Sequence, residues 1–137
     1  MKRYLFLFAL LILTFTSCTV ESDDRPQFYL EVLPIDSVEM PEQFVHGETY
    51  EIWITYTRPT LCYEFNDFFY EIDGHERTVA IINTVYTNFD CVEESEQITV
   101  RMEFPVTGTD TYVFKFYQGQ DENEVDQYYL VEVPVVQ

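Results

Sequence analysis

The sequence predicts an all-β protein, a seven-stranded Greek-key β-sandwich that follows an N-terminal signal peptide. Beyond Pro26, apolar side chains alternate with polar ones at every second position, which is the period of a half-buried strand. Turn-forming residues interrupt this alternation at intervals typical of a sandwich. Aromatic residues make up 18% of the sequence, so this strongly acidic chain still has the apolar material for a folded core.

Residues 1–17 have the pattern of a secretory signal peptide that is removed from the mature protein. Lys2 and Arg3 form a positive end, residues 4–15 form an apolar run, and the small pair Thr16-Ser17 follows. A membrane-spanning helix needs about 20 apolar residues, and this run is shorter. We therefore expect an export signal here and not a transmembrane anchor.

The boundary "FTSC" (15–18) resembles the lipobox of bacterial lipoproteins, although Phe15 stands where an aliphatic residue is usual. The resemblance implies that Cys18 becomes the first mature residue and carries lipid. Each buried methylene contributes about 0.8 kcal/mol to membrane binding, so a cysteine with several acyl chains holds a domain firmly on the bilayer. The alternative is a plain secreted protein without lipid.

Residues 18–26 then form the lipidated cysteine and an acidic tether. Within it, Ser22, Asp23 and Asp24 resemble the acidic export signal of Bacteroidota-type surface lipoproteins. This resemblance implies an outer-membrane protein that is lipid-anchored and exposed on the cell surface. The alternative is a solvated tether that contains no export signal.

The remaining residues, 27–137, are predicted to form one β-sandwich domain. Arg58-Pro59-Thr60 separates two strands, Asp73-Gly74 is a hairpin signal, and Gly108 and Asp110 form a later turn. The predicted strands are 27–39, 48–57, 62–72, 77–86, 96–106, 111–118 and 127–135.

The stretch "GTDTYVFKFYQG" (108–119) resembles the penultimate strand of immunoglobulin-like domains. The resemblance implies an immunoglobulin-like sandwich in which Tyr112 makes a tyrosine-corner hydrogen bond. The chain departs from true immunoglobulin domains because Trp53 precedes Cys62 and does not lie between Cys62 and Cys91. The resemblance therefore concerns architecture and not function.

Cys62 and Cys91 are predicted to form a disulfide, because lipid occupies Cys18 and an exported protein folds in an oxidising compartment. Counting back from the turn at Gly74 places Cys62 opposite residue 86, a few residues before Cys91. The sequence has no C-x-x-C pair and no histidines at zinc-ligand spacing, so no redox site and no metal site are predicted.

The formal net charge of −18 excludes a nucleic acid partner, whose phosphates require Lys and Arg. No catalytic motif is present, and His46 and His75 lie in predicted turns, so neither an enzyme nor a cofactor is expected. The acidic loop 121–126 does not match the EF-hand pattern. We interpret it as a solvated loop, and the alternative is a weak calcium site.

Strand 62–72 carries aromatic residues on both faces, with Tyr63, Phe65 and Phe69 expected on one and Phe68 and Tyr70 on the other. Either a second face packs against more of the chain, or an exposed aromatic patch marks a binding site. We predict a surface-exposed binding or adhesion accessory domain with a protein or glycan partner and no catalysis. The alternatives are an immunoglobulin-like proteinase-inhibitor module and a purely structural envelope lipoprotein.

Overall fold

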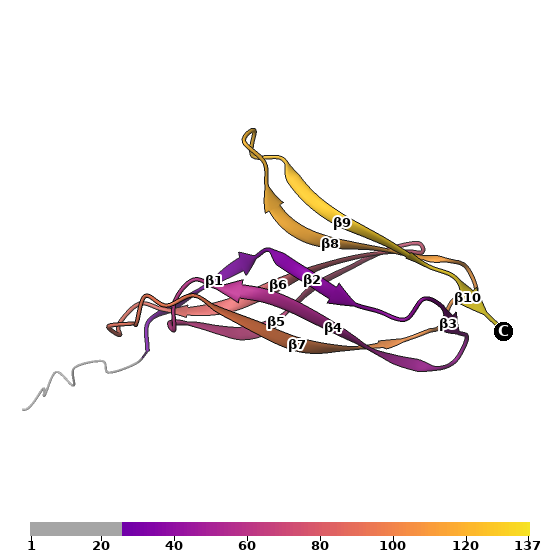
Figure 1. The fold of residues 1–137 in the computed structure, drawn as a ribbon, viewed down its shortest axis with the longest axis horizontal. Coiled ribbons are helices and arrows are strands. Elements are labelled where there is room, and N and C mark those ends of the chain that lie inside the picture. Colours follow the sequence, from indigo (N-terminus) through magenta and orange to yellow (C-terminus); the bar gives the residue numbers. More distant parts are fainter. Residues whose placement is uncertain (1–25) are drawn as a thin grey trace, which may run out of the picture.

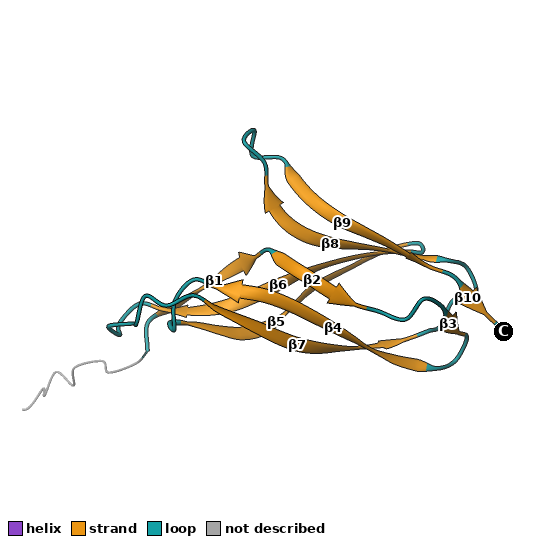
Figure 2. Ribbon diagram, viewed as in Figure 1, coloured by secondary structure: helices purple, strands orange, loops and turns teal. Residues whose placement is uncertain are grey.

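The computed structural model describes residues 26–137 as strands joined by turns and loops, with no helix in that range (Figures 1 and 2). Most strands coincide with segments of alternating polarity, where β-branched and aromatic residues favour an extended backbone. The strands are β1 (Phe28–Leu33), β2 (Ile35–Glu39), β3 (Phe44–Val45), β4 (Thr49–Arg58), β5 (Tyr63–Asp73), β6 (Glu76–Tyr86), β7 (Glu96–Pro105), β8 (Tyr112–Gln120), β9 (Asp126–Val133) and β10 (Val135–Val136).

Two sheets pack against each other. In sheet A, β6 pairs with β1, β5 and β8, and β9 pairs with β8. In sheet B, β4 lies between β2 and β7, and β3 and β10 form a separate parallel pair. Along β6, β8 runs parallel beside residues 76–79, whereas β1 runs antiparallel beside residues 81–86.

The prediction of an all-β fold with packed sheets is confirmed, but the count of seven strands is wrong. The first predicted strand is divided at Pro34 between β1 in sheet A and β2 in sheet B, and the last is divided at Pro134. Proline has no backbone N–H to donate to a ladder, so both interruptions have a direct cause. The sequence analysis also missed β3, which is only two residues long.

The core lies between the sheets and is rich in aromatic rings. The alternation predicted for the second strand is confirmed, since Ile52, Ile54 and Tyr56 of β4 are fully buried. Across from them, Phe114 and Phe116 of β8 are also fully buried, with stacked rings 5.7 Å apart. These side chains remove a large apolar area from water, which is the main stabilising contribution to such a fold.

Tyr112 forms the hydrogen bond that the sequence predicted. The backbone N–H of Gly108 donates to the Tyr112 hydroxyl over 2.7 Å, and the tyrosine is almost fully buried. A β-carbon at position 108 would lie 2.9 Å from that hydroxyl oxygen, which is closer than real β-carbon contacts. A larger residue at position 108 would therefore have to displace the buried Tyr112 side chain, which disfavours substitution of this glycine.

The structure also brings Cys62 and Cys91 to disulfide distance, with their Cα atoms 5.5 Å apart. The register confirms the count from the turn, because the N–H of Tyr86 donates to the carbonyl of Cys62 over 3.2 Å. The pair ties the start of β5 to the loop after β6, within one sheet and not across the core.

Candidate binding surface

The two outer faces of the sandwich differ in chemistry. On sheet B, outward side chains are polar apart from Trp53 and Pro105, as expected for a solvated sheet face. Arg101 pairs with Glu51 there, with 2.7 Å between Nη1 and Oε1, and the hydroxyls of Thr55 and Thr99 are hydrogen-bonded at 2.8 Å. Sheet B therefore presents an ordinary water-facing surface.

The outer face of sheet A is instead rich in apolar side chains, although it too lies open to solvent. Phe28, Leu30 and Leu130 are each more than half exposed, at 59%, 57% and 60%. The strand register places these residues on the side of sheet A that faces away from the core. The residues paired with them on neighbouring strands lie on the same side. We call this surface the apolar face, and it consists of Phe28, Leu30, Val32, Phe69, Ile82, Tyr86, Tyr117, Tyr128 and Leu130.

A β-bulge in β5 changes the face assignment made from the sequence. The register shifts between Phe65 and Asp67, so strict alternation fails at that point. Tyr63 and Phe65 consequently lie on the same side as Phe68 and Tyr70, and the rings of Phe65 and Phe68 are 5.0 Å apart. The expectation that Phe69 shares a face with Tyr63 and Phe65 is therefore wrong, and Phe69 alone of these aromatics joins the apolar face.

A shallow hollow of about 240 Å³ lies near the middle of the apolar face. Val32 of β1, Phe69 of β5, and Tyr117 and Tyr128 of the β8–β9 hairpin line it, with Ala80 of β6 as its floor. Beyond its pairing with β6, this hairpin rises away from the rest of the sandwich (Figure 1). The divergence leaves the apolar side chains of β1 uncovered by β8 and β9.

Carboxylates border the apolar face. Glu64 and Glu71 lie opposite Thr84 and Thr78 of β6, and Asp126 lines the hollow. Lys115, the one lysine or arginine on this side among residues 26–137, already contacts Glu76 with 3.7 Å between Nζ and Oε2. Its ammonium also lies 5.3 Å from the centre of the Tyr128 ring. The border therefore has an excess of negative charge around an apolar centre.

Tyr86 and Tyr117 of this surface are neutral at physiological pH, because their pKa values are raised. Burial raises the pKa of Tyr117, and the nearby Asp126 and Tyr128 raise it further. The hydroxyl of Tyr86 donates to Glu64 over 3.2 Å, and this hydrogen bond raises the pKa of Tyr86. The apolar face thus offers neutral rings with polar tips, which suit a protein or glycan contact.

A signal for the apolar face is present in the sequence but was not among the predictions made from it. In "FYLEVL" (28–33), apolar residues occupy both odd and even positions. Alternate residues of a strand point to opposite faces of the sheet, so one apolar set must face away from the core. Leu33 enters the core, and the set that contains Phe28, Leu30 and Val32 points outward. The structure groups these residues with Phe69, which is distant in the sequence.

The other residues that the sequence singled out lie elsewhere. Cys18, Ser22, Asp23 and Asp24 lie outside the described residues. His46 is hydrogen-bonded through Nδ1 to the carbonyl oxygen of Gly108, at 3.0 Å.

The loop 121–126 is held by one of its own carboxylates. Oδ1 of Asp121 accepts hydrogen bonds from the backbone N–H groups of Asn123 and Val125. Its Oδ2 accepts from the amide of Gln127 over 3.2 Å. Both oxygens of Asp121 therefore serve the turn between β8 and β9.

Comparison with known proteins adds no relative to this description. No family model, no curated protein and no solved structure matches the chain. Among residues 26–137, no helix has the length and apolar character to cross a membrane. The same residues contain no group of three or more His, Cys, Asp or Glu side chains placed to hold a metal ion.

Proposed function

We propose that this protein is a lipid-anchored envelope lipoprotein of the outer membrane that binds a partner protein at the cell surface through its apolar face. One observation carries the proposal. The two outer faces of the same sandwich face solvent, yet sheet B presents polar side chains and sheet A presents a contiguous apolar set. Contiguous exposed apolar patches of this kind mark interaction sites. The proposal includes an immunoglobulin-like Greek-key topology for the sandwich that carries this surface.

The charge around the apolar face indicates the chemistry of the partner. The full chain has a formal charge of −18, and Lys115 on this side already has Glu76 as a partner. A complementary protein surface has an apolar centre bordered by Lys and Arg, which pair with carboxylates such as Glu64 and Asp126. Several apolar side chains here are aliphatic, which favours a protein over a glycan.

Site-directed photo-crosslinking in intact cells tests this proposal. A photo-crosslinking phenylalanine analogue replaces Leu30 or Phe69 on the apolar face, and Trp53 on sheet B is the matched aromatic control. We expect one protein with a basic, apolar surface to be captured from positions 30 and 69 and not from position 53. The capture should weaken as NaCl is raised from about 0.05 to 0.5 M, because salt screens the charged border.

Three outcomes would contradict the proposal that a partner protein binds the apolar face. Equal capture from all three positions would show that the contact is unspecific. Capture of a second copy of the chain would assign the surface to self-association. A glycan that protects the apolar face in hydrogen exchange, while no protein is captured, would replace the protein partner.

A specific observation also favours a second candidate, the immunoglobulin-like proteinase-inhibitor module. Leu61, Phe89 and Val92 are exposed on two loops at one end of the sandwich. The N–H of Leu61 donates to the carbonyl of Val92 over 3.1 Å, and the cysteine pair lies in the same loops. The loops thus present three apolar side chains among polar and acidic residues, and they are braced, which suits a cleft-blocking inhibitor. Capture of a proteinase from position 89, and not from position 30, would favour this candidate.

The lipid anchor gives a further prediction. A Cys18→Ser variant should lose label from a radioactive fatty acid and should no longer be processed to the mature form, because no thiol remains to carry lipid. A matched Cys62→Ser variant should keep its label. The lipoprotein proposal is wrong if the Cys18→Ser variant stays processed, labelled and membrane-bound.

A further inference from the structure

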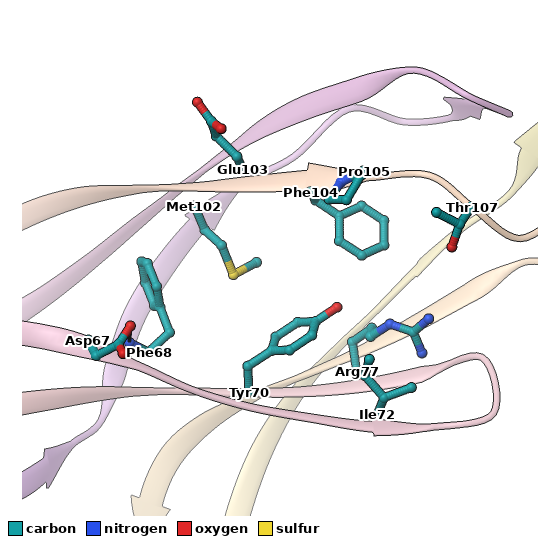
Figure 3. Close-up of a pocket in the computed structure, with 10 residues that line it drawn as sticks. All are labelled: Asp67, Phe68, Tyr70, Ile72, Arg77, Met102, Glu103, Phe104, Pro105 and Thr107. Atoms are coloured by element: carbon teal, nitrogen blue, oxygen red, sulfur yellow. Dashed lines mark hydrogen bonds between the residues drawn. The ribbon is translucent and has the colours of Figure 1, made fainter.

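A cleft of about 350 Å³ opens between the edge strands of the two sheets, on the core side of β5 and away from the apolar face. Phe68, Tyr70 and Ile72 of β5 form one wall, and Met102 and Phe104 of β7 form the other (Figure 3). Its volume falls at the lower end of the range of small-molecule sites, and its lining is mainly apolar. The carboxylate of Asp67 lies at its margin, whereas that of Glu103 points away from the cleft, 3.9 Å from Arg101 (Figure 3).

Arg77 of β6 lines one end of this cleft, at a position that alternates with the buried Val79 and Ile81. Only 8% of its surface is exposed. Its Nη1 donates to the carbonyls of Gly74 and Glu76 at 2.9 and 2.7 Å, and its guanidinium carbon lies 4.9 Å from the centre of the Tyr112 ring. These contacts hold the guanidinium in one place.

The charge of Arg77 has no carboxylate partner among residues 26–137. The other three basic residues of this range, Arg58, Arg101 and Lys115, each pair with a glutamate. Nε of Arg77 is buried without a hydrogen-bond acceptor among the described residues. Burying a guanidinium without an anion is costly, so a very acidic chain that keeps one at the end of a cleft offers a site for an anion.

Other polar groups gather at the same end. In Figure 3 the hydroxyls of Tyr70 and Thr107 point toward the space beside Arg77, under the ring of Phe104. Burial raises the pKa of Tyr70, although the nearby Arg77 lowers it in part. The Tyr70 hydroxyl thus remains protonated and able to donate at neutral pH. Phe68 and Met102 continue the cleft as an apolar channel away from these donors.

We propose that this cleft binds a small amphipathic monocarboxylate, whose carboxylate is held by Arg77 and Tyr70 and whose hydrocarbon part lies against Phe68, Met102 and Phe104. The planar guanidinium matches the geometry of a carboxylate. The single cation and the carboxylate of Asp67 disfavour a doubly charged anion such as phosphate. The same chemistry can come from a free acid or from the C-terminus of a peptide.

Calorimetric titration of the mature protein tests the proposal. Its chain begins at residue 18 and carries Cys18→Ser, so it has neither lipid nor the apolar run 4–15, no detergent is needed to keep it in solution, and none fills the cleft. Octanoate, 1-octanol and octylammonium are the probes, because they share one hydrocarbon chain and differ in charge. We expect octanoate to bind about tenfold or more tightly than 1-octanol, since a hydrogen bond to a charged group is worth at least that factor. Octylammonium should be the weakest of the three.

Two substitutions locate the site. Tyr70→Phe keeps the ring and should weaken octanoate about tenfold while leaving 1-octanol unchanged. Arg77→Lys keeps the charge but loses the planar fork, and it should weaken octanoate at least as much. Tyr128→Phe on the apolar face is the matched control and should change neither ligand. Circular dichroism confirms that each variant is folded before titration.

The results separate the proposal from its alternatives. Tighter binding of N-acetyl-Leu-Phe than of octanoate supports the carboxylate site and assigns it to a peptide C-terminus. Equal affinity for octanoate and 1-octanol, no binding of octanoate, or full affinity in folded Tyr70→Phe and Arg77→Lys variants would overturn it. None of these results bears on the apolar face, which lies on the other side of β5.

Discussion

Phe114→Ala should lower the free energy of unfolding by about 3–5 kcal/mol, as is typical when a fully buried phenylalanine is removed. The Phe114 ring is fully buried in β8. Its centre lies 5.0 Å from that of Phe104 in β7 and 6.1 Å from that of Phe44 in β3, so it joins the two sheets. The loss combines the transfer of the ring to water with the cavity left between the sheets.

Urea unfolding followed by circular dichroism and by the fluorescence of Trp53, the single tryptophan, measures this loss. Phe28→Ala is the matched control, because Phe28 is 59% exposed on the apolar face. We expect the control to change stability by less than about 1 kcal/mol. A similar loss in both variants would mean that the β8 ring does not carry the core contact described here.

Local patterns in the sequence predicted most of the strands. Alternation over two residues is a property of neighbouring positions, and Gly74, Gly108 and the prolines mark turns directly. The hydrogen bond of Tyr112 and the alignment of Cys62 with Tyr86 could also be predicted, because each depends on one turn or one hairpin. Short-range features of this fold can therefore be predicted from the sequence.

Features that depend on distant residues could not be predicted in the same way. The pairing of β8 with β6 and the assignment of β1 and β2 to different sheets, on either side of Pro34, follow from packing across the whole domain. The bulge after Phe65 reverses the faces of β5, and nothing in its immediate sequence marks the position. The apolar face and the position of Arg77 both depend on these choices, so the candidate sites emerged only with the structure.

The pair Cys62 and Cys91 gives the second large prediction. A bond between them closes a loop with a sequence separation of 29. From loop-closure entropy in the unfolded chain, such a bond should stabilise the domain by roughly 3–4 kcal/mol. The native backbone is already placed for it, because hydrogen bonds such as Leu61 N–H to the Val92 carbonyl hold the two segments together. The bond therefore restricts the unfolded state while requiring little rearrangement of the folded one.

We expect a Cys62→Ser, Cys91→Ser double variant to fold with the same strands but to unfold at lower urea concentration than the parent protein. Dithiothreitol should lower the stability of the parent by about the same amount and leave the double variant unchanged, which makes the variant its own control. Non-reducing digestion and mass spectrometry should find one peptide pair linked through Cys62 and Cys91. Free thiols at both positions in protein from its native envelope would contradict the bond. In that case, the hydrogen bonds between the 59–63 and 86–92 segments, and the burial of Cys62, would have to hold this end of sheet A without a covalent link.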